Sequence, residues 1–143
     1  MDSLFCTPQA ASGCISVLLT IQLSCLAFLS IVFVQSGLDK VVDWKGNVEW
    51  LTGHFSKTFL APFVKPMVAS ITVMEVGAGI LCGVGAVSLL LTGSKAIGIL
   101  GALLCSLTFL SLFFGQRVAK DYPGALGIVP YFLLTMATLY VLQ

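Results

Sequence analysis

The residue best placed to do chemistry is Glu75, in the stretch SITVMEVGAGILCGVG that runs from Ser70 to Gly85. Every other residue of this stretch is apolar or small. A carboxylate inside a membrane costs about 2.5 to 3.5 kcal/mol, so it should face the protein interior and find a partner. Two interpretations remain open. Glu75 is a structural lock, paired with Lys40 or Arg117 or protonated against a backbone carbonyl, or it is a proton-transfer or ligand-binding group, for example one that hydrogen-bonds the head of a quinone.

Five cysteines and one histidine are the other candidates for chemistry. The cysteines form no CxxC pair, which argues against a thioredoxin-like motif and against a zinc site. Cys25, Cys82 and Cys105 are expected to pack as small apolar residues, while Cys6 and Cys14 either pair or stay as thiols. His54 is more typical of an interfacial polar group than of a haem or chlorophyll ligand. No metal site and no covalently bound cofactor is expected, because iron-sulfur, flavin and nucleotide motifs are missing from the sequence.

The elements that must position these residues follow from composition. Hydrophobic residues make up 58% of the 143 residues and charged ones 9%, against about 25% charged in an ordinary soluble domain. Four apolar runs, at residues 14–35, 67–91, 96–115 and 125–142, have the roughly 18 to 25 residues needed to cross a bilayer as helices. The sequence therefore predicts an all-α integral membrane four-helix bundle, one domain over residues 1–143. The lipid bilayer is its environment, and nucleic acid is excluded because a net charge of +1 offers no clustered cations.

The long connection between the first and second spans is predicted to form an amphipathic helix on the membrane surface. Its apolar side chains at helical spacing are Val48, Leu51, Phe55 and Phe59. Trp44 and Trp50 suit the headgroup zone of a bilayer. Pro62 and Pro66 are expected to break the chain before the second span begins.

The basic residues predict the orientation. Six of them lie in the two long connections, at Lys40, Lys45, Lys57, Lys65, Arg117 and Lys120. The other side of the membrane has only Lys95. By the positive-inside rule both long connections face the cytoplasm and both termini face the periplasm of a bacterial inner membrane.

This topology gathers the polar residues at one end of the bundle. The predicted buried polar cluster or ligand-binding site consists of Gln35, Lys40, Glu75, Gln116, Arg117, Lys120, Asp121 and Tyr122. Glu75 shares one helix face with Cys82 and with a GxxxG step at Gly79 and Gly83, which lets another helix approach closely. Gly98 and Gly101 are expected to give the third span a matching small face.

Three segments, FVQSGLDKVVDW, HFSKTFLAPFVKPMVASITVMEVGAGILCGVG and LFFGQRVAKDYPGA, resemble the DoxX family of small four-helix bacterial membrane proteins, especially its Bacteroidetes type. The most recognisable parts are SG-x-x-K, from Ser36 to Lys40, and an acid followed by glycines, here Glu75, Gly77 and Gly79. The chain departs from many members in having no basic residue near the start of its first helix.

The resemblance implies two functions. One is a non-catalytic accessory subunit, without enzyme activity of its own, of a larger redox-linked or energy-linked membrane complex or a homo-oligomer. The other follows the family's namesake, the small membrane subunit of a thiosulfate:quinone oxidoreductase, and makes the chain a quinone-interacting subunit whose partner holds the redox cofactor. A quinone or a lipid is the expected ligand in either case. Transport is a third possibility, but the sequence has neither a marked broken helix nor an internal repeat.

Overall fold

The computed structural model describes residues 16–143, and every regular element in this range is a helix. The elements are α1 (Val17–Val42), α2 (Trp44–His54), the 3-10 turn η1 (Ala61–Phe63), α3 (Val64–Thr92), α4 (Ala96–Val118) and α5 (Tyr122–Leu142). Four of the helices, α1, α3, α4 and α5, are long and apolar enough to cross a membrane. The predicted all-α bundle of four membrane spans is therefore confirmed.

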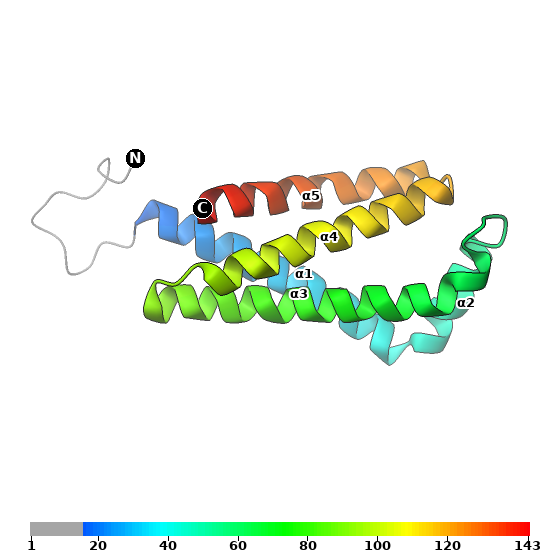
Figure 1. The fold of residues 1–143 in the computed structure, drawn as a ribbon, viewed down its shortest axis with the longest axis horizontal. Helices are drawn as coiled ribbons and strands as arrows, with labels where there is room; N and C mark the ends of the chain where they lie inside the picture. The colour runs from blue at the N-terminus through cyan, green and yellow to red at the C-terminus, as the bar shows by residue number, and fades with distance from the viewer. Residues whose placement is uncertain (1–15) are drawn as a thin grey trace, which may run out of the picture.

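The four long helices run side by side, with α2 at one end of the bundle and the start of α1 and the end of α5 at the other (Figure 1). α3 packs against both α1 and α4, and α5 packs chiefly against α4. The amide Nε2 of Gln22 in α1 donates to the carbonyl oxygen of Val141 in α5, 2.6 Å away. The short α3–α4 turn (residues 93–95) therefore lies at the end of the bundle opposite α2 (Figure 1). The α4–α5 turn (residues 119–121) is equally short, and most of the charged residues lie at the α2 end, many of them inside helices.

Several helix boundaries differ by a few residues from those expected, and two of them change the placement of a named residue. α1 ends at Val42 rather than at residue 35, so Lys40 lies inside a helix rather than in a connection. α3 begins at Val64, and Pro66 lies in its first turn instead of breaking the chain before it. Proline is tolerated there because the first backbone N–H groups of a helix have no intrahelical acceptor. The expectation that Pro66 precedes the second span is therefore wrong.

The predicted helix in the long connection is present as α2 but is shorter than its apolar pattern indicated. The carboxylate of Asp43 caps its start by accepting from the backbone N–H of Gly46 at 3.1 Å. The helix ends at His54. Phe55 turns inward to pack against Val64 and Val68, whereas Phe59 is 68% exposed in the turns that follow.

Small residues bring α3 close to its neighbours, but not in the expected pairing. A Cβ atom added to Gly79 would lie 2.8 Å from the backbone nitrogen of Val34, and one on Gly83 would lie 2.9 Å from the hydroxyl of Ser30, so the GxxxG step faces α1. Ser30 also donates to the carbonyl of Gly79 at 2.8 Å. The α4 glycines meet a different part of α3: Gly98 lies against Gly85, and Gly101 lies against Cys82.

The backbones of α3 and α4 approach each other closely at two glycines. A Cβ on Gly85 would lie 2.5 Å from the Cα atom of Gly98, and one on Gly101 would lie 2.8 Å from the backbone nitrogen of Cys82. The thiols of Cys82 and Cys105 are both fully buried here, with their sulfur atoms 3.5 Å apart. The pair Cys6 and Cys14 lies outside the described residues.

Candidate functional site

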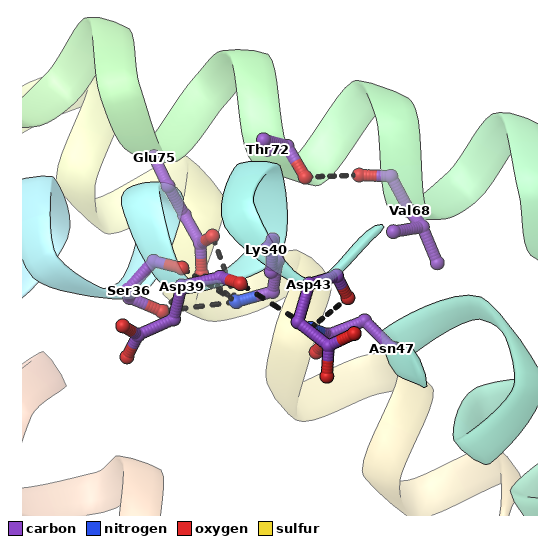
Figure 2. Close-up of polar contacts among 8 residues, drawn as sticks. All are labelled: Ser36, Asp39, Lys40, Asp43, Asn47, Val68, Thr72 and Glu75. Atoms are coloured by element: carbon purple, nitrogen blue, oxygen red, sulfur yellow. Dashed lines mark hydrogen bonds and ion pairs between the residues drawn. The ribbon is translucent and has the colours of Figure 1, made fainter. Parts of the chain in front are cut away.

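Glu75 is 1% exposed and lies against α1, where it meets Lys40 and Ser36 (Figure 2). The Lys40 ammonium is 3.1 Å from carboxylate oxygen Oε1 and 2.9 Å from Oε2. The Ser36 hydroxyl donates to Oε1 at 3.0 Å. Lys40 also donates to the hydroxyl of Ser36 at 2.9 Å and to its carbonyl at 3.3 Å. Three residues from two helices thus form one closed polar group.

The local sequence explains this geometry. Ser36 and Lys40 are four residues apart, so both lie on the face of α1 that meets α3. Gly37 lies between them and allows the close approach, because a Cβ there would be 2.5 Å from the Cγ2 methyl of Val76 and 3.2 Å from its backbone nitrogen. In the SG-x-x-K sequence, Ser36 therefore supplies a hydroxyl to the carboxylate of Glu75 and Lys40 supplies a cation. Gly37 leaves the space that lets α3 approach.

The charges of Lys40 and Glu75 compensate each other inside the bundle. Oε2 is close to the ammonium but accepts no well-aligned hydrogen bond from the described residues, so its partner acts through charge rather than through a directed bond. Pairing of the two charges offsets part of the penalty that each would carry alone in the membrane. Of the two cations considered as partners for Glu75, the structure places Lys40 beside it, and this geometry favours the structural lock.

A second polar cluster joins α2 to the α4–α5 turn. Nε2 of His54 lies 3.1 Å from the side-chain oxygen of Gln116 and 3.8 Å from a carboxylate oxygen of Asp121. The imidazole stacks on the indole of Trp50, with ring centroids 4.8 Å apart, and meets Phe55 edge-on. His54 thus contacts two predicted site residues. Sequence reasoning missed this contact because no local pattern shows where the end of α2 lies relative to the α4–α5 turn.

The turn between α4 and α5 is built by its own capping contacts. Lys120 has a left-handed backbone (φ 59°), its N–H bonds to the carbonyl of Arg117 at 3.2 Å, and the Asp121 N–H bonds to the carbonyl of Gln116 at 2.9 Å. This is the Schellman pattern that ends many helices, with lysine where glycine is usual. Asp121 then caps α5 by accepting from the N–H of Gly124 at 3.0 Å.

The predicted site residues therefore divide into groups rather than forming one cluster. Lys40 and Glu75 pair with each other, and Gln116 and Asp121 meet at His54. Arg117, Lys120, Tyr122 and Gln35 are exposed. The Arg117 guanidinium lies over the ring of Tyr122, 4.7 Å from its centroid. Ser36 belongs to the ion-pair group although only the family resemblance drew attention to it.

A cavity of about 260 Å³ lies between the two polar groups, under α2. Lys40 and Gln116 line it from opposite helices, and Asn47 and Trp50 line it from α2. The rest of its wall is mainly apolar and comes from α2, Phe55, α3 and α4. Within residues 16–143 no cluster of three or more His, Cys, Asp or Glu side chains is arranged to hold a metal ion.

Comparisons of the chain with family models, with curated proteins and with solved structures gave no match. Membership of the DoxX family therefore stays a prediction from the three sequence segments. The fold itself defines the class of the molecule. It is a multi-pass membrane protein with a helical bundle, and an ion pair joins two of its spans.

Proposed function

We propose that the protein is a non-catalytic accessory subunit of a larger redox-linked or energy-linked bacterial membrane complex and a member of the DoxX family. The observation that carries the proposal is the closed group of Lys40, Glu75 and Ser36. A carboxylate that relays protons or binds substrate needs an accessible oxygen. Both oxygens of Glu75 instead lie against side chains of α1, which is the arrangement of a helix lock.

The outer surface of the bundle supports an accessory role. α3 presents Val73, Ile80 and Val87 outward at intervals of seven residues, all exposed. α5 presents Leu126, Leu133 and Tyr140 at the same interval. Apolar stripes of this kind can contact the acyl chains of a bilayer. They can also pack against helices of a partner, because membrane helices associate through close packing rather than through a hydrophobic driving force.

Purification from native membranes tests the proposal. The expected result is that a tag after Gln143 recovers, in gentle detergent, a complex of fixed stoichiometry. A second purification with Lys40→Met/Glu75→Gln, which removes both charges together, should recover the same complex with unchanged turnover. A stable single chain with no partner at any stage would overturn the accessory role. An intact complex that loses turnover only on removal of the carboxylate would overturn the non-catalytic one.

A quinone-interacting subunit is the second candidate function. The cavity under α2 favours it, because Lys40 and Gln116 border a space whose remaining walls are mainly apolar, as a quinone head and ring require. The cofactor that supplies the electrons would belong to a partner. Gln116→Leu in the purified complex should then raise the quinone concentration needed for half-maximal turnover about five- to tenfold, the loss expected for one hydrogen bond. An unchanged value would exclude this candidate.

The proposed location is the bacterial inner membrane, with both termini in the periplasm. Its support is that six of the seven basic residues belong to the α2 end of the bundle, while Lys95 at the opposite end contacts the carbonyl of Gln143 at 3.2 Å. A reporter enzyme that is active only in the periplasm should be active when fused after Gln143. Activity only of a cytoplasmic reporter at that position would reverse the orientation.

A further inference from the structure

The cavity under α2 adjoins a larger groove on the lipid-facing surface. The groove, about 660 Å³, runs between α3 and α4. The two hollows share four lining residues, Met67, Ile71, Ser111 and Gly115. Together they fall in the size range of small-molecule sites, about 300 to 1,000 Å³. The two hollows therefore adjoin across these four residues, and we call the cavity under α2 the inner end and the groove the outer end.

The outer end is apolar. Phe63, Leu110 and Phe114 line it and are themselves exposed, and serines supply the only hydroxyls in its wall within the described residues. The groove extends along α3 to Met74, which is about 15 Å of helix rise from Val64. This is the direction from the α2 end toward the middle of the bundle. An acyl or isoprenoid chain fits such a groove better than a polar molecule does.

The inner end offers hydrogen bonds but no free charge. Gln116 uses its side-chain oxygen on His54, which leaves its amide NH₂ without a partner among the described residues. Asn47 uses its amide NH₂ on the carbonyls of Asp43 and Asp39, which leaves its oxygen free to accept. Figure 2 shows Asn47 turned back to the end of α1 in this way. Lys40 is the one charged residue in this wall, and Glu75 already compensates it.

We propose that the cavity and the groove bind one single-chain amphiphile with an uncharged, hydrogen-bonding head group. The head lies under α2, where it accepts from the Gln116 amide and donates to the Asn47 oxygen, and the chain lies between α3 and α4. An anionic head would have to displace Glu75 from Lys40, and a cationic head would find no free anion. Monoacylglycerols, long-chain alcohols and isoprenoid quinols share this chemistry. The proposal stands whether or not the protein is an accessory subunit.

The two tryptophans provide a test on the full chain. Trp50 lines the cavity and Trp44 does not, so Trp44→Phe leaves a reporter inside the site and Trp50→Phe leaves a matched reporter outside it. The probe is 2-bromohexadecanol, whose bromine lies beside a neutral head and quenches indole fluorescence on contact. The expected result is saturable quenching of Trp50 at one probe per chain. Trp44 should show only the weak, linear quenching of a probe dissolved in the detergent micelle or bilayer.

Two variants locate the site. Gln116→Leu should lower the affinity for the probe about five- to tenfold. Ser111→Phe, which fills the junction of the two hollows, should abolish the saturable quenching of Trp50. Arg117→Gln is the control, because Arg117 follows Gln116 directly but lies outside the cavity, and it should change the affinity less than twofold. Unchanged binding in both Gln116→Leu and Ser111→Phe, or equal quenching of both tryptophans, would overturn the proposal.

Competition identifies the source of the ligand. Monopalmitoylglycerol and a decyl benzoquinol are the two neutral competitors, and palmitate at pH 9 is the charged one. Displacement by either neutral compound and not by palmitate supports the proposal. Displacement by the quinol alone identifies a quinone site and agrees with the second candidate function, whereas displacement by the glyceride identifies a lipid site. Displacement by palmitate as effective as by the neutral compounds would overturn the requirement for an uncharged head.

Discussion

The ammonium of Lys40 lies 2.9 Å from a carboxylate oxygen of Glu75, and the two residues belong to different membrane-spanning helices. The pair is nearly inaccessible, with exposed side-chain fractions of 17% and 2%. It is therefore an internal connection between α1 and α3 and not a surface ion pair, which would contribute about 1 kcal/mol or less. The cost of disrupting the pair should therefore depend on whether one partner or both are removed.

Loss of one partner should destabilise the bundle more than loss of both. Lys40→Met leaves a buried carboxylate and Glu75→Gln leaves a buried ammonium, so each should lower the free energy of unfolding in detergent by about 3 kcal/mol or more. The double variant should lose less than either single variant. Lys45→Met is the control, because the Lys45 side chain is 89% exposed, and it should change stability by about 0.5 kcal/mol or less. Additive losses would contradict a coupled pair.

The contact of Gly85 with Gly98 should not tolerate a methyl group. Gly85→Ala places a Cβ 2.6 Å from the backbone nitrogen of Gly98, so α3 and α4 must move apart and lose packing that no flexible side chain can restore. We expect a loss of about 1 to 3 kcal/mol in the free energy of unfolding. Gly77→Ala on the same helix is the control, since its Cβ would meet Leu104 at an ordinary 3.5 Å. Equal effects of the two changes would contradict the backbone contact.

The turn after α4 should gain stability when Lys120 is replaced by glycine. The left-handed backbone at position 120 costs about 1 to 2 kcal/mol for a residue that has a Cβ atom. Replacement by glycine removes this cost, but the greater freedom of glycine in the unfolded chain offsets part of the gain. Lys120→Gly should therefore stabilise the bundle by about 0.5 to 1 kcal/mol in thermal unfolding. Lys120→Ala keeps the Cβ and should bring no such gain. Destabilisation by glycine would show that the lysine side chain itself stabilises the turn.

The four membrane spans could be predicted from sequence because hydropathy over a window of bilayer length is a strong signal. The ends of α1 and α3 could not, because polar residues such as Lys40 continue a helix when a partner compensates them, and Pro66 is harmless in a first turn. Hydropathy indicates whether a segment lies in lipid or in water, but it does not indicate which contacts stabilise the last turn of a helix. The boundary error matters here, because it placed Lys40 in a loop, whereas the structure places Lys40 inside α1, where its side chain pairs with Glu75 of α3.

The site was harder to predict than the fold. The topology correctly brought Lys40 and Glu75 to the same end, but it could not separate the ion pair from the His54 cluster, because both lie at that end and rotation about each helix axis decides which residues meet. Gln35 shows this: one residue before Ser36, it is exposed while Ser36 bonds Glu75. The partner of His54 likewise depends on where the end of α2 lies relative to the α4–α5 turn, which no local pattern encodes.

The thiols of Cys82 and Cys105 should form a disulfide under mild oxidation. Their sulfur atoms are 3.5 Å apart at the α3–α4 contact, and a shift of about 1.5 Å brings them to bonding distance. With Cys6 and Cys14 replaced by serine, prolonged treatment with the membrane-permeable oxidant diamide, which reaches these buried thiols when the α3–α4 contact opens locally, should take one hydrogen from each thiol. The protein is then denatured and alkylated, and mass spectrometry should find the alkyl group on Cys25 alone. Cys105→Ala is the control and should leave both Cys25 and Cys82 open to alkylation, whereas alkylation of all three cysteines after oxidation of the parent would contradict the observed contact.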